Sequence, residues 1–260
     1  MRFKTFLEAT ITGYEKEDHS IDSLIKLLKE HCKDSLHAGA ESEQSQIWRG
    51  SKSVHKSGIF RPGSGERKSQ NTANYYTVLL DTNPLNKGWP LRSKSFICST
   101  LRRRAAAYGG ERKGETSGTV LALFPFDDVD IGLANSSDIW NLKVKFKKYG
   151  LDETLVSLNN YWERFMATVG ENNKVPTMPE LLKLLRDNED VIDDIFSDDT
   201  SSLPSYFIAE MEKAYSYKAL GCELTNPGEV NHENSEVWFS GPCVGVTQHD
   251  WRAIAEEFKL

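Results

Sequence analysis

The sequence predicts an α+β fold, because segments with strand character lie toward both ends of the chain and segments with helical character lie between them. Strands that are separated by long helical segments need not pair in the order of the sequence. A length of 260 residues allows one large domain, or one domain with an added helical lobe. We expect an N-terminal helical segment at 1–45 and a main domain at 46–260 with a helical insertion at about 150–218.

The composition indicates a water-soluble globular chain. Apolar residues make up 38% of the chain, which is enough for a core, and the 27% of charged residues fits an exposed surface. A net charge of −6 argues against a general nucleic-acid coat protein, which would carry a basic face. The first eight residues contain no apolar signal core, and no apolar run is long enough to span a membrane. We therefore expect a cytoplasmic site of action and no membrane partner.

The cysteines and histidines predict no metal site. The four cysteines are widely spaced and form no Cys-x-x-Cys pair, which disfavours both zinc and a disulfide framework. They are Cys32, Cys98, Cys222 and Cys243. The six histidines show no metal-like spacing either. Scattered free thiols suit a reducing cytosol.

The first predicted helix begins near residue 21. Ile21, Leu24, Leu28 and Cys32 fall on one helical face, and Ser20 is placed to cap the N-terminus. A polar loop at 37–46 then leads into a strand that contains Trp48 and ends at Arg49 and a turn-forming Gly50. Residues 51–74 are rich in Ser, Gly, Lys and Asn and predict an irregular loop. Residues 75–80 fit either a helix or a strand.

The next elements are better defined. Residues 95–100 predict a strand, residues 102–108 a helix favoured by its alanines, and residues 118–124 a buried strand. Helical spacing at 155–165 predicts a helix. Thr177 and Glu180 form a capping box that opens another helix through Leu185.

The last third of the chain alternates between polar and apolar segments. Residues 187–199 are strongly acidic and predict a solvated, partly helical segment, and residues 205–218 predict a further helix. The final predicted strands, at 237–239 and 243–246, meet at a turn at 240–242.

Three motifs occur in a set order along these elements. Arg49 ends one strand, Ser99 and Thr100 end a second, and Glu236 opens a third. This ordered Arg–Ser–Glu set resembles that of mono-ADP-ribosyltransferases, and the chain looks most like bacteriophage-encoded, toxin-like members. The likeness spans roughly residues 49–246. It implies a split β-sandwich that binds NAD, as a substrate, between two small sheets, and action in the host cytoplasm if a phage encodes the chain.

The chemistry of NAD cleavage explains why these residue types would be needed. Loss of nicotinamide builds positive charge on the ribose, as in glycoside hydrolysis. A guanidinium can hold phosphate oxygens bidentately, which makes Arg49, beside Gly50, the phosphate-binding candidate. The resemblance implies that Ser99 braces the site. Glu236 would stabilise the developing cation electrostatically and is our candidate for catalysis.

Alternatives remain for several of these positions. Ser95 and Ser99 share a strand face, so a shift of register would make Ser95 the motif serine. Glu233 competes with Glu236 if the last strand begins earlier. Thr100 belongs to the same motif and is a further NAD-binding candidate. Tyr76 would stack on nicotinamide or adenine, or serve packing instead.

The residue that bears on the identity of the acceptor is Asn234, two positions before Glu236. The resemblance implies that arginine-modifying relatives carry Glu at this position, so a neutral amide argues against arginine specificity. Glu233 could supply a displaced carboxylate, which weakens that inference. The expected acceptor is a protein or a nucleic acid. The run Arg102-Arg103-Arg104 would meet phosphates of NAD or of a nucleic acid, or form a solvated helix face.

Two rival functions fit the same residues. An NAD glycohydrolase would use nearly the same site, with water as the acceptor. A non-catalytic binding protein, associated with a virion or with a host partner, would keep the fold without the reaction.

Overall fold

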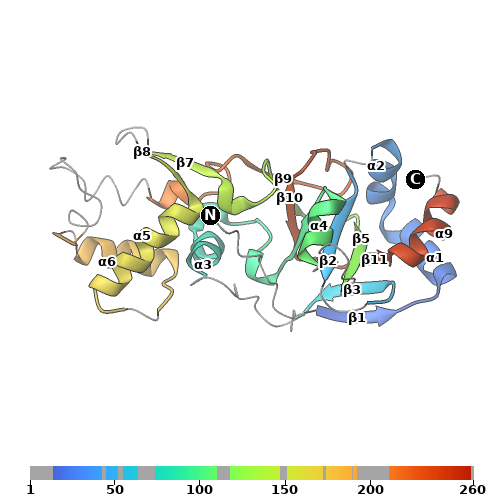
Figure 1. Cartoon of the computed structure of the whole chain (residues 1–260), viewed down its shortest axis with the longest axis horizontal. Helices are drawn as coiled ribbons and strands as arrows, with labels where there is room; N and C mark the ends of the chain where they lie inside the picture. Colours follow the sequence, from blue (N-terminus) through green and yellow to red (C-terminus); the bar gives the residue numbers. More distant parts are fainter. Residues whose placement is uncertain are drawn as a thin grey trace. The chain divides into compact units, whose positions relative to one another are not determined.

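The computed structural model describes residues 14–42, 45–51, 55–63, 74–109, 118–146, 151–171, 174–188, 190–191 and 211–258. The chain divides into two compact units (Figure 1). Unit 1 comprises Met1–Asn71, Trp89–Ser137 and Glu223–Leu260, and unit 2 comprises Thr72–Gly88 and Asp138–Cys222. The segment predicted at 1–45 falls inside unit 1, and the insertion predicted at about 150–218 falls inside unit 2.

Unit 1 is built on a nine-stranded sheet in the order β1-β3-β11-β5-β2-β4-β10-β6-β9. Its strands are β1 (Tyr14–Asp18), β2 (Ile47–Ser51), β3 (Gly58–Pro62), β4 (Phe96–Ser99), β5 (Thr119–Pro125), β6 (Ile131–Ala134), β9 (Cys222–Thr225), β10 (Glu236–Phe239) and β11 (Cys243–Thr247). The strand pairs of defined register, which join β1 through β6 in that order, are antiparallel. The sheet is antiparallel, its neighbouring strands are far apart in sequence, and helices lie between them in the chain. The predicted α+β class is therefore confirmed.

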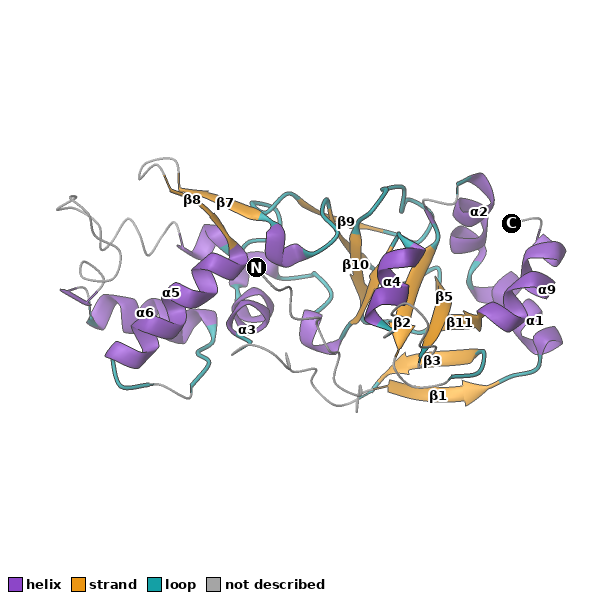
Figure 2. Ribbon diagram, viewed as in Figure 1, coloured by secondary structure: helices purple, strands orange, loops and turns teal. Residues whose placement is uncertain are grey.

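The two faces of this sheet carry separate cores, because side chains alternate along each strand. One core joins Ile47 of β2 and Leu121 of β5 to Phe96 of β4 and Val237 of β10. The other core, on the opposite face, lies between β5, β11 and three helices, α1 (Ile21–His31), α2 (Lys33–Glu41) and α9 (Gln248–Phe258). Figure 2 shows α1 and α9 side by side near β11, and α2 contacts β5.

Helix α1 matches its prediction. The Ser20 hydroxyl accepts a hydrogen bond from the Ser23 N–H at the N-terminus, and Leu24 and Leu28 are buried. The loop predicted at 37–46 was wrong for residues 37–41, which form the second half of helix α2. Its one large apolar residue is Leu36, so the helix is held by tertiary contacts such as the hydrogen bond from Ser35 Oγ to the Pro125 carbonyl at 3.0 Å.

Helix α4 (Arg102–Tyr108) also forms as predicted and packs on β2. Gly50, predicted as a turn residue, lies within β2 instead. A Cβ atom at Gly50 would come within 1.8 Å of the Ala105 carbonyl oxygen. Glycine at this position therefore serves the close approach of α4 rather than a turn.

Strand β3 corrects the loop predicted at 51–74. It lies between β1 and β11, where Phe60 pairs with Lys16 and with Cys243. Strand β1 itself, Tyr-Glu-Lys-Glu-Asp, is so polar that its sequence gives no strand signal, and it forms the edge of the sheet. Edge strands tolerate such charged sequences because one side faces solvent.

Unit 2 contains α3 (Tyr75–Thr82), α5 (Leu155–Thr168), α6 (Met178–Asp187), the antiparallel pair β7 (Lys143–Phe146) and β8 (Leu151–Thr154), and the 3₁₀ turns η2 (Pro84–Asn86) and η4 (Ile139–Asn141). The capping box of Thr177 and Glu180 is confirmed. The core of this unit contains Trp162, whose indole N–H donates to the Tyr215 hydroxyl at 2.5 Å. The acidic segment predicted at 187–199 lies largely outside the described residues. Of the helix predicted at 205–218 the structure describes 211–218, which are helical at 211–214 and not at 215–218.

Two further features concern the cysteines and the length of the helices. All four cysteines are buried free thiols. Within the described ranges, no helix is both long and apolar enough to cross a membrane.

Candidate functional site

The predicted motif residues lie on three neighbouring strands of unit 1, β2, β4 and β10. Ser99 is the residue directly opposite Glu236 in the β4–β10 pair, and on its other side it is opposite Trp48 of β2. Residues that are directly opposite in an antiparallel pair point to the same face, with Cβ atoms about 5 Å apart. The structure therefore brings the side chains of Ser99 and Glu236 together.

Thr100 joins the end of β4 to the start of β10 through two hydrogen bonds. Its N–H donates to the Ser235 carbonyl at 3.0 Å, and its hydroxyl oxygen accepts from the Ser235 N–H at 2.9 Å. The Ser99 hydroxyl accepts from the Leu101 N–H at 3.1 Å, which orients it at the strand end. The Ser-Thr motif thus fixes the position at which Glu236 begins β10.

Glu236 forms a buried ion pair that the sequence analysis did not identify. Its Oε1 lies 2.6 Å from Nη2 of Arg92, and the two residues are only 5% and 2% exposed. Arg92 opens the 3₁₀ turn η3 (Arg92–Lys94), just before β4. It lies seven positions before Ser99 in the segment that leads into the Ser-Thr motif, but no feature of the sequence assigns it a role.

Two stacked tryptophans, Trp238 and Trp89, hold the Arg92 guanidinium in place. The guanidinium carbon lies 5.0 Å from the centre of the Trp238 ring, and the Trp238 indole N–H donates to the Pro90 carbonyl at 3.1 Å. Trp89 stacks on the same indole at 6.1 Å. Gly132, opposite Trp238 in β6, leaves room for the ring, since a Cβ there would lie 2.1 Å from it. The guanidinium that pairs with the Glu236 carboxylate is therefore held in a fixed position.

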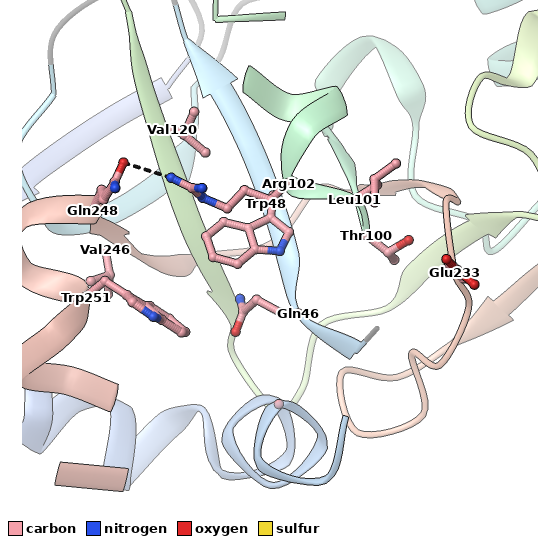
Figure 3. Close-up of a pocket in the computed structure, with 11 residues that line it drawn as sticks. Gln46, Trp48, Thr100, Leu101, Arg102, Val120, Glu233, Val246, Gln248 and Trp251 are labelled. Carbon is pink, nitrogen blue, oxygen red and sulfur yellow. Dashed lines mark hydrogen bonds between the residues drawn. The ribbon is translucent and has the colours of Figure 1, made fainter. Parts of the chain in front are cut away.

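A pocket of about 610 Å³ is lined by residues of β2, β5, β11, α4 and α9, and it extends to Thr100, just after β4, and to Glu233, three positions before β10 (Figure 3). We call it the indole pocket, because Trp48 and Trp251 form part of its wall together with Thr100, Arg102, Glu233 and Gln248. Two of the predicted binding residues, Thr100 and Glu233, thus line one pocket. Asn234 adjoins Glu233 and is exposed with a left-handed φ of 58°, a conformation that asparagine tolerates.

Arg49 lies on the other face of the sheet from Ser99 and Glu236. It pairs with Leu121 of the first core, whereas its neighbour Trp48 pairs with Ser99. Its Nη1 donates to the Ile97 carbonyl at 2.7 Å, and the guanidinium lies 5.6 Å from the Phe96 ring. Alternation along β2 thus separates the side chain of Arg49 from the carboxylate that it was expected to accompany. Its role in binding phosphate stays a prediction.

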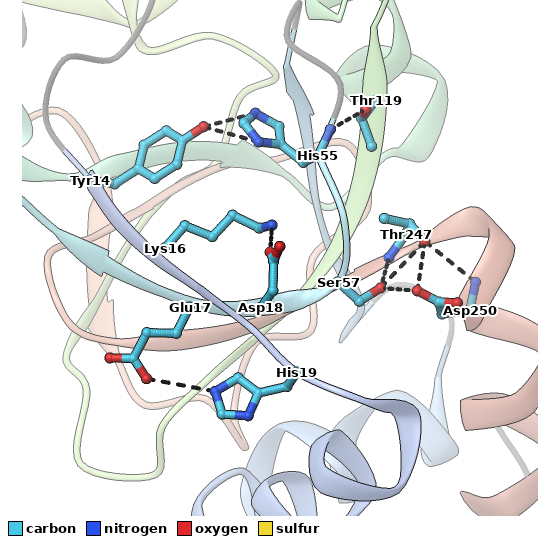
Figure 4. Close-up of polar contacts among 10 residues, drawn as sticks. All are labelled: Tyr14, Lys16, Glu17, Asp18, His19, His55, Ser57, Thr119, Thr247 and Asp250. Carbon is cyan, nitrogen blue, oxygen red and sulfur yellow. Dashed lines mark hydrogen bonds and ion pairs between the residues drawn. The ribbon is translucent and has the colours of Figure 1, made fainter.

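His55 lies near Arg49 beside the β1 edge. Figure 4 shows its contact with Tyr14. His55 Nε2 lies 2.7 Å from the Tyr14 hydroxyl and 2.8 Å from the Ser51 hydroxyl. Burial, with the positive charges of Lys16 and Arg49, lowers the pKa of His55. The ring is therefore neutral at pH 7 and serves to hold β1 against β2.

The remaining predicted residues have structural partners. The Ser95 hydroxyl donates to the Leu91 carbonyl at 2.6 Å and closes the η3 turn, so Ser99 is the serine that faces Glu236. Tyr76 belongs to unit 2, where it is buried with its ring 4.0 Å from Trp140. This position fits the alternative in which Tyr76 serves packing.

In the part of the chain that the structure describes, no group of three or more His, Cys, Asp or Glu residues could hold a metal ion. Comparisons with protein-family models, curated proteins and solved structures return no match to this chain. The functional assignment therefore depends on the residues and the geometry described above.

Proposed function

We propose that the protein is an NAD-dependent mono-ADP-ribosyltransferase, which transfers ADP-ribose from NAD to a macromolecular acceptor and releases nicotinamide. The observation that carries this proposal is the direct cross-strand pairing of Ser99 of β4 with Glu236 of β10, where β4 also adjoins the strand that holds Arg49. The order of the three motifs along the chain thus corresponds to neighbouring strands in space.

The sheet supports an ADP-ribosyltransferase-like split β-sandwich. Strands β2 and β4 share the single residue pair Trp48–Ser99, whereas β2 and β5 share five pairs. The strands therefore group into β1-β3-β11-β5-β2 and β4-β10-β6-β9, and the first core contains residues from both groups. The motif residues lie at the junction of the two groups.

In this proposal Glu236 performs the electrostatic part of the reaction. As nicotinamide leaves, the ribose carbon loses its bonding electrons to the leaving group and becomes cationic, and a nearby carboxylate lowers the energy of that state. An acceptor atom then forms the new bond to this carbon and gives up its proton. Ser99 positions the substrate from the adjacent strand.

Arg92 sets the geometry of the carboxylate. The ion pair holds one oxygen of Glu236 against the Arg92 guanidinium, which itself lies on the Trp238 ring, so that the Glu236 side chain is oriented before the substrate arrives. Arg49 would contribute phosphate binding only if a phosphate reaches the face on which its guanidinium lies. The acceptor remains a protein or a nucleic acid, and the neutral Asn234 argues against arginine.

The test is transfer of radiolabel from NAD to proteins and nucleic acids of a cell lysate. We expect transfer by the wild-type protein and none by Glu236→Gln. Because that substitution leaves the Arg92 charge buried without its partner, the double variant Arg92→Met/Glu236→Gln serves as a second inactive form without an unpaired charge. Undiminished transfer by a folded Glu236 variant would overturn the proposal. Release of free ADP-ribose without any labelled acceptor would point to an NAD glycohydrolase instead.

A further inference from the structure

The indole pocket has a size and a wall chemistry that suit one nucleotide. Its volume of about 610 Å³ lies within the range of small-molecule sites, roughly 300–1,000 Å³. Thr100, in its wall, is the residue after Ser99, and Glu233 precedes Glu236 by three positions. The pocket therefore adjoins the proposed catalytic pair, although neither Ser99 nor Glu236 is among its lining residues.

The apolar part of the wall consists of two indoles. Trp48 of β2 and Trp251 of α9 are both partly exposed, with ring centres 5.5 Å apart. Phe124 stacks on Trp251 at 6.0 Å with an angle of 17° between the rings, which keeps that indole in place. Partly exposed, fixed aromatic rings are the surfaces on which nucleic-acid bases stack.

The polar part of the wall holds a guanidinium at the edge of the indoles. Arg102 Nη2 donates to Gln248 Oε1 at 2.8 Å, as Figure 3 shows, and the guanidinium lies 5.7 Å from the centre of the Trp48 ring. These two contacts restrain a side chain that is otherwise exposed. A restrained guanidinium with further N–H donors is suited to a phosphate.

The local charge favours an anion despite the net charge of −6. A second hollow shares Leu101 and Arg102 with the indole pocket and adds Arg103. Among the described residues that line the two hollows, Glu233 is the only acidic one. A carboxylate at this position suits the hydroxyl groups of a ribose, the role that acidic residues fill in dinucleotide sites.

We propose that the indole pocket binds a nucleotide, with its base against Trp48 and Trp251 and its phosphate on Arg102. The inference rests on the proposed function, which requires nucleotide chemistry at this position. Two sources share that chemistry: the ADP half of NAD, and a nucleotide within a nucleic-acid acceptor.

Binding of AMP and of adenosine, followed by titration calorimetry, tests the proposal. Arg102→Gln should weaken AMP binding about tenfold, the effect expected when a charge-assisted hydrogen bond is lost, and should leave adenosine binding unchanged. Arg252→Gln is the matched control, because Arg252 is an exposed arginine of α9 that lines neither hollow. It should change neither affinity by more than about twofold.

Competition identifies the source of the nucleotide. Displacement of AMP by NAD, with a raised KM for NAD in Arg102→Gln, assigns the pocket to the donor. Displacement by a single-stranded hexanucleotide of RNA or DNA, with an unchanged KM for NAD, assigns it to a nucleic-acid acceptor. Absence of AMP binding, or equal losses for AMP and adenosine in Arg102→Gln, would overturn the inference. A wild-type protein that binds AMP but transfers no label to any acceptor would overturn the proposed function alone.

Discussion

The guanidinium of Arg92 and the carboxylate of Glu236 lie 2.6 Å apart in the interior of unit 1, where each is almost completely buried. Burial of two charges is costly, and the mutual attraction offsets that cost only while both partners are present. The pair therefore links the stability of the fold to the geometry of the proposed site.

Replacement of Arg92 by Gln should lower the free energy of unfolding by about 3–5 kcal/mol, because the Glu236 charge would then be buried without its partner. Urea denaturation measures the loss. Arg252→Gln is the control, since Arg252 pairs with Glu256 on the exposed surface of α9 and should have little effect. Equal effects of the two substitutions would contradict the importance of the buried pair.

The two candidate serines should separate in their effects. Ser99→Ala should reduce label transfer at least tenfold, because Ser99 faces Glu236. Ser95→Ala should leave transfer nearly unchanged, since its hydroxyl bonds to the Leu91 carbonyl. Each substitution removes one hydrogen bond and should lower the free energy of unfolding by about 1 kcal/mol. Transfer rates and urea denaturation of both variants check this, and the reverse pattern would make Ser95 the motif serine.

Gly50→Ala should destabilise unit 1 by roughly 2 kcal/mol or more, because the added methyl group would collide with the backbone of α4 at Ala105. Gly170→Ala provides a comparison, since a Cβ at Gly170 meets nothing within 4 Å and the only penalty arises from its φ of 83°. That penalty is about 1 kcal/mol. Thermal denaturation of both variants measures the difference, and a smaller effect at Gly50 would show that α4 can move away from β2.

Stability should fall as the pH is lowered through about 6.5, the ordinary pKa of histidine, because the pKa of His55 is lower in the folded state. The unfolded chain then binds more protons than the folded one, and the free energy of unfolding declines until the pH passes the folded pKa. Urea denaturation between pH 7.5 and 5.5 measures this slope. His55→Gln should reduce it, and an identical slope in that variant would show that other groups cause it.

The sequence was sufficient for elements whose signals are local. The apolar face and serine cap of α1, the alanines of α4, and the capping box of α6 each act within one or two turns of helix. The order of the Arg, Ser and Glu motifs was also enough to expect three separate strand positions. By contrast β1 is polar and α2 has one large apolar residue, so both form through contacts with distant segments.

Long-range pairing accounts for what the sequence left open about the site. The register of β4 against β10 selects Ser99 over Ser95, and the register of β2 against β4 turns Arg49 toward the first core. The partner of Glu236 comes from η3, more than 140 residues earlier in the chain. Residue types and their order can be read locally, whereas the face to which a strand residue points depends on a register that only the assembled sheet defines.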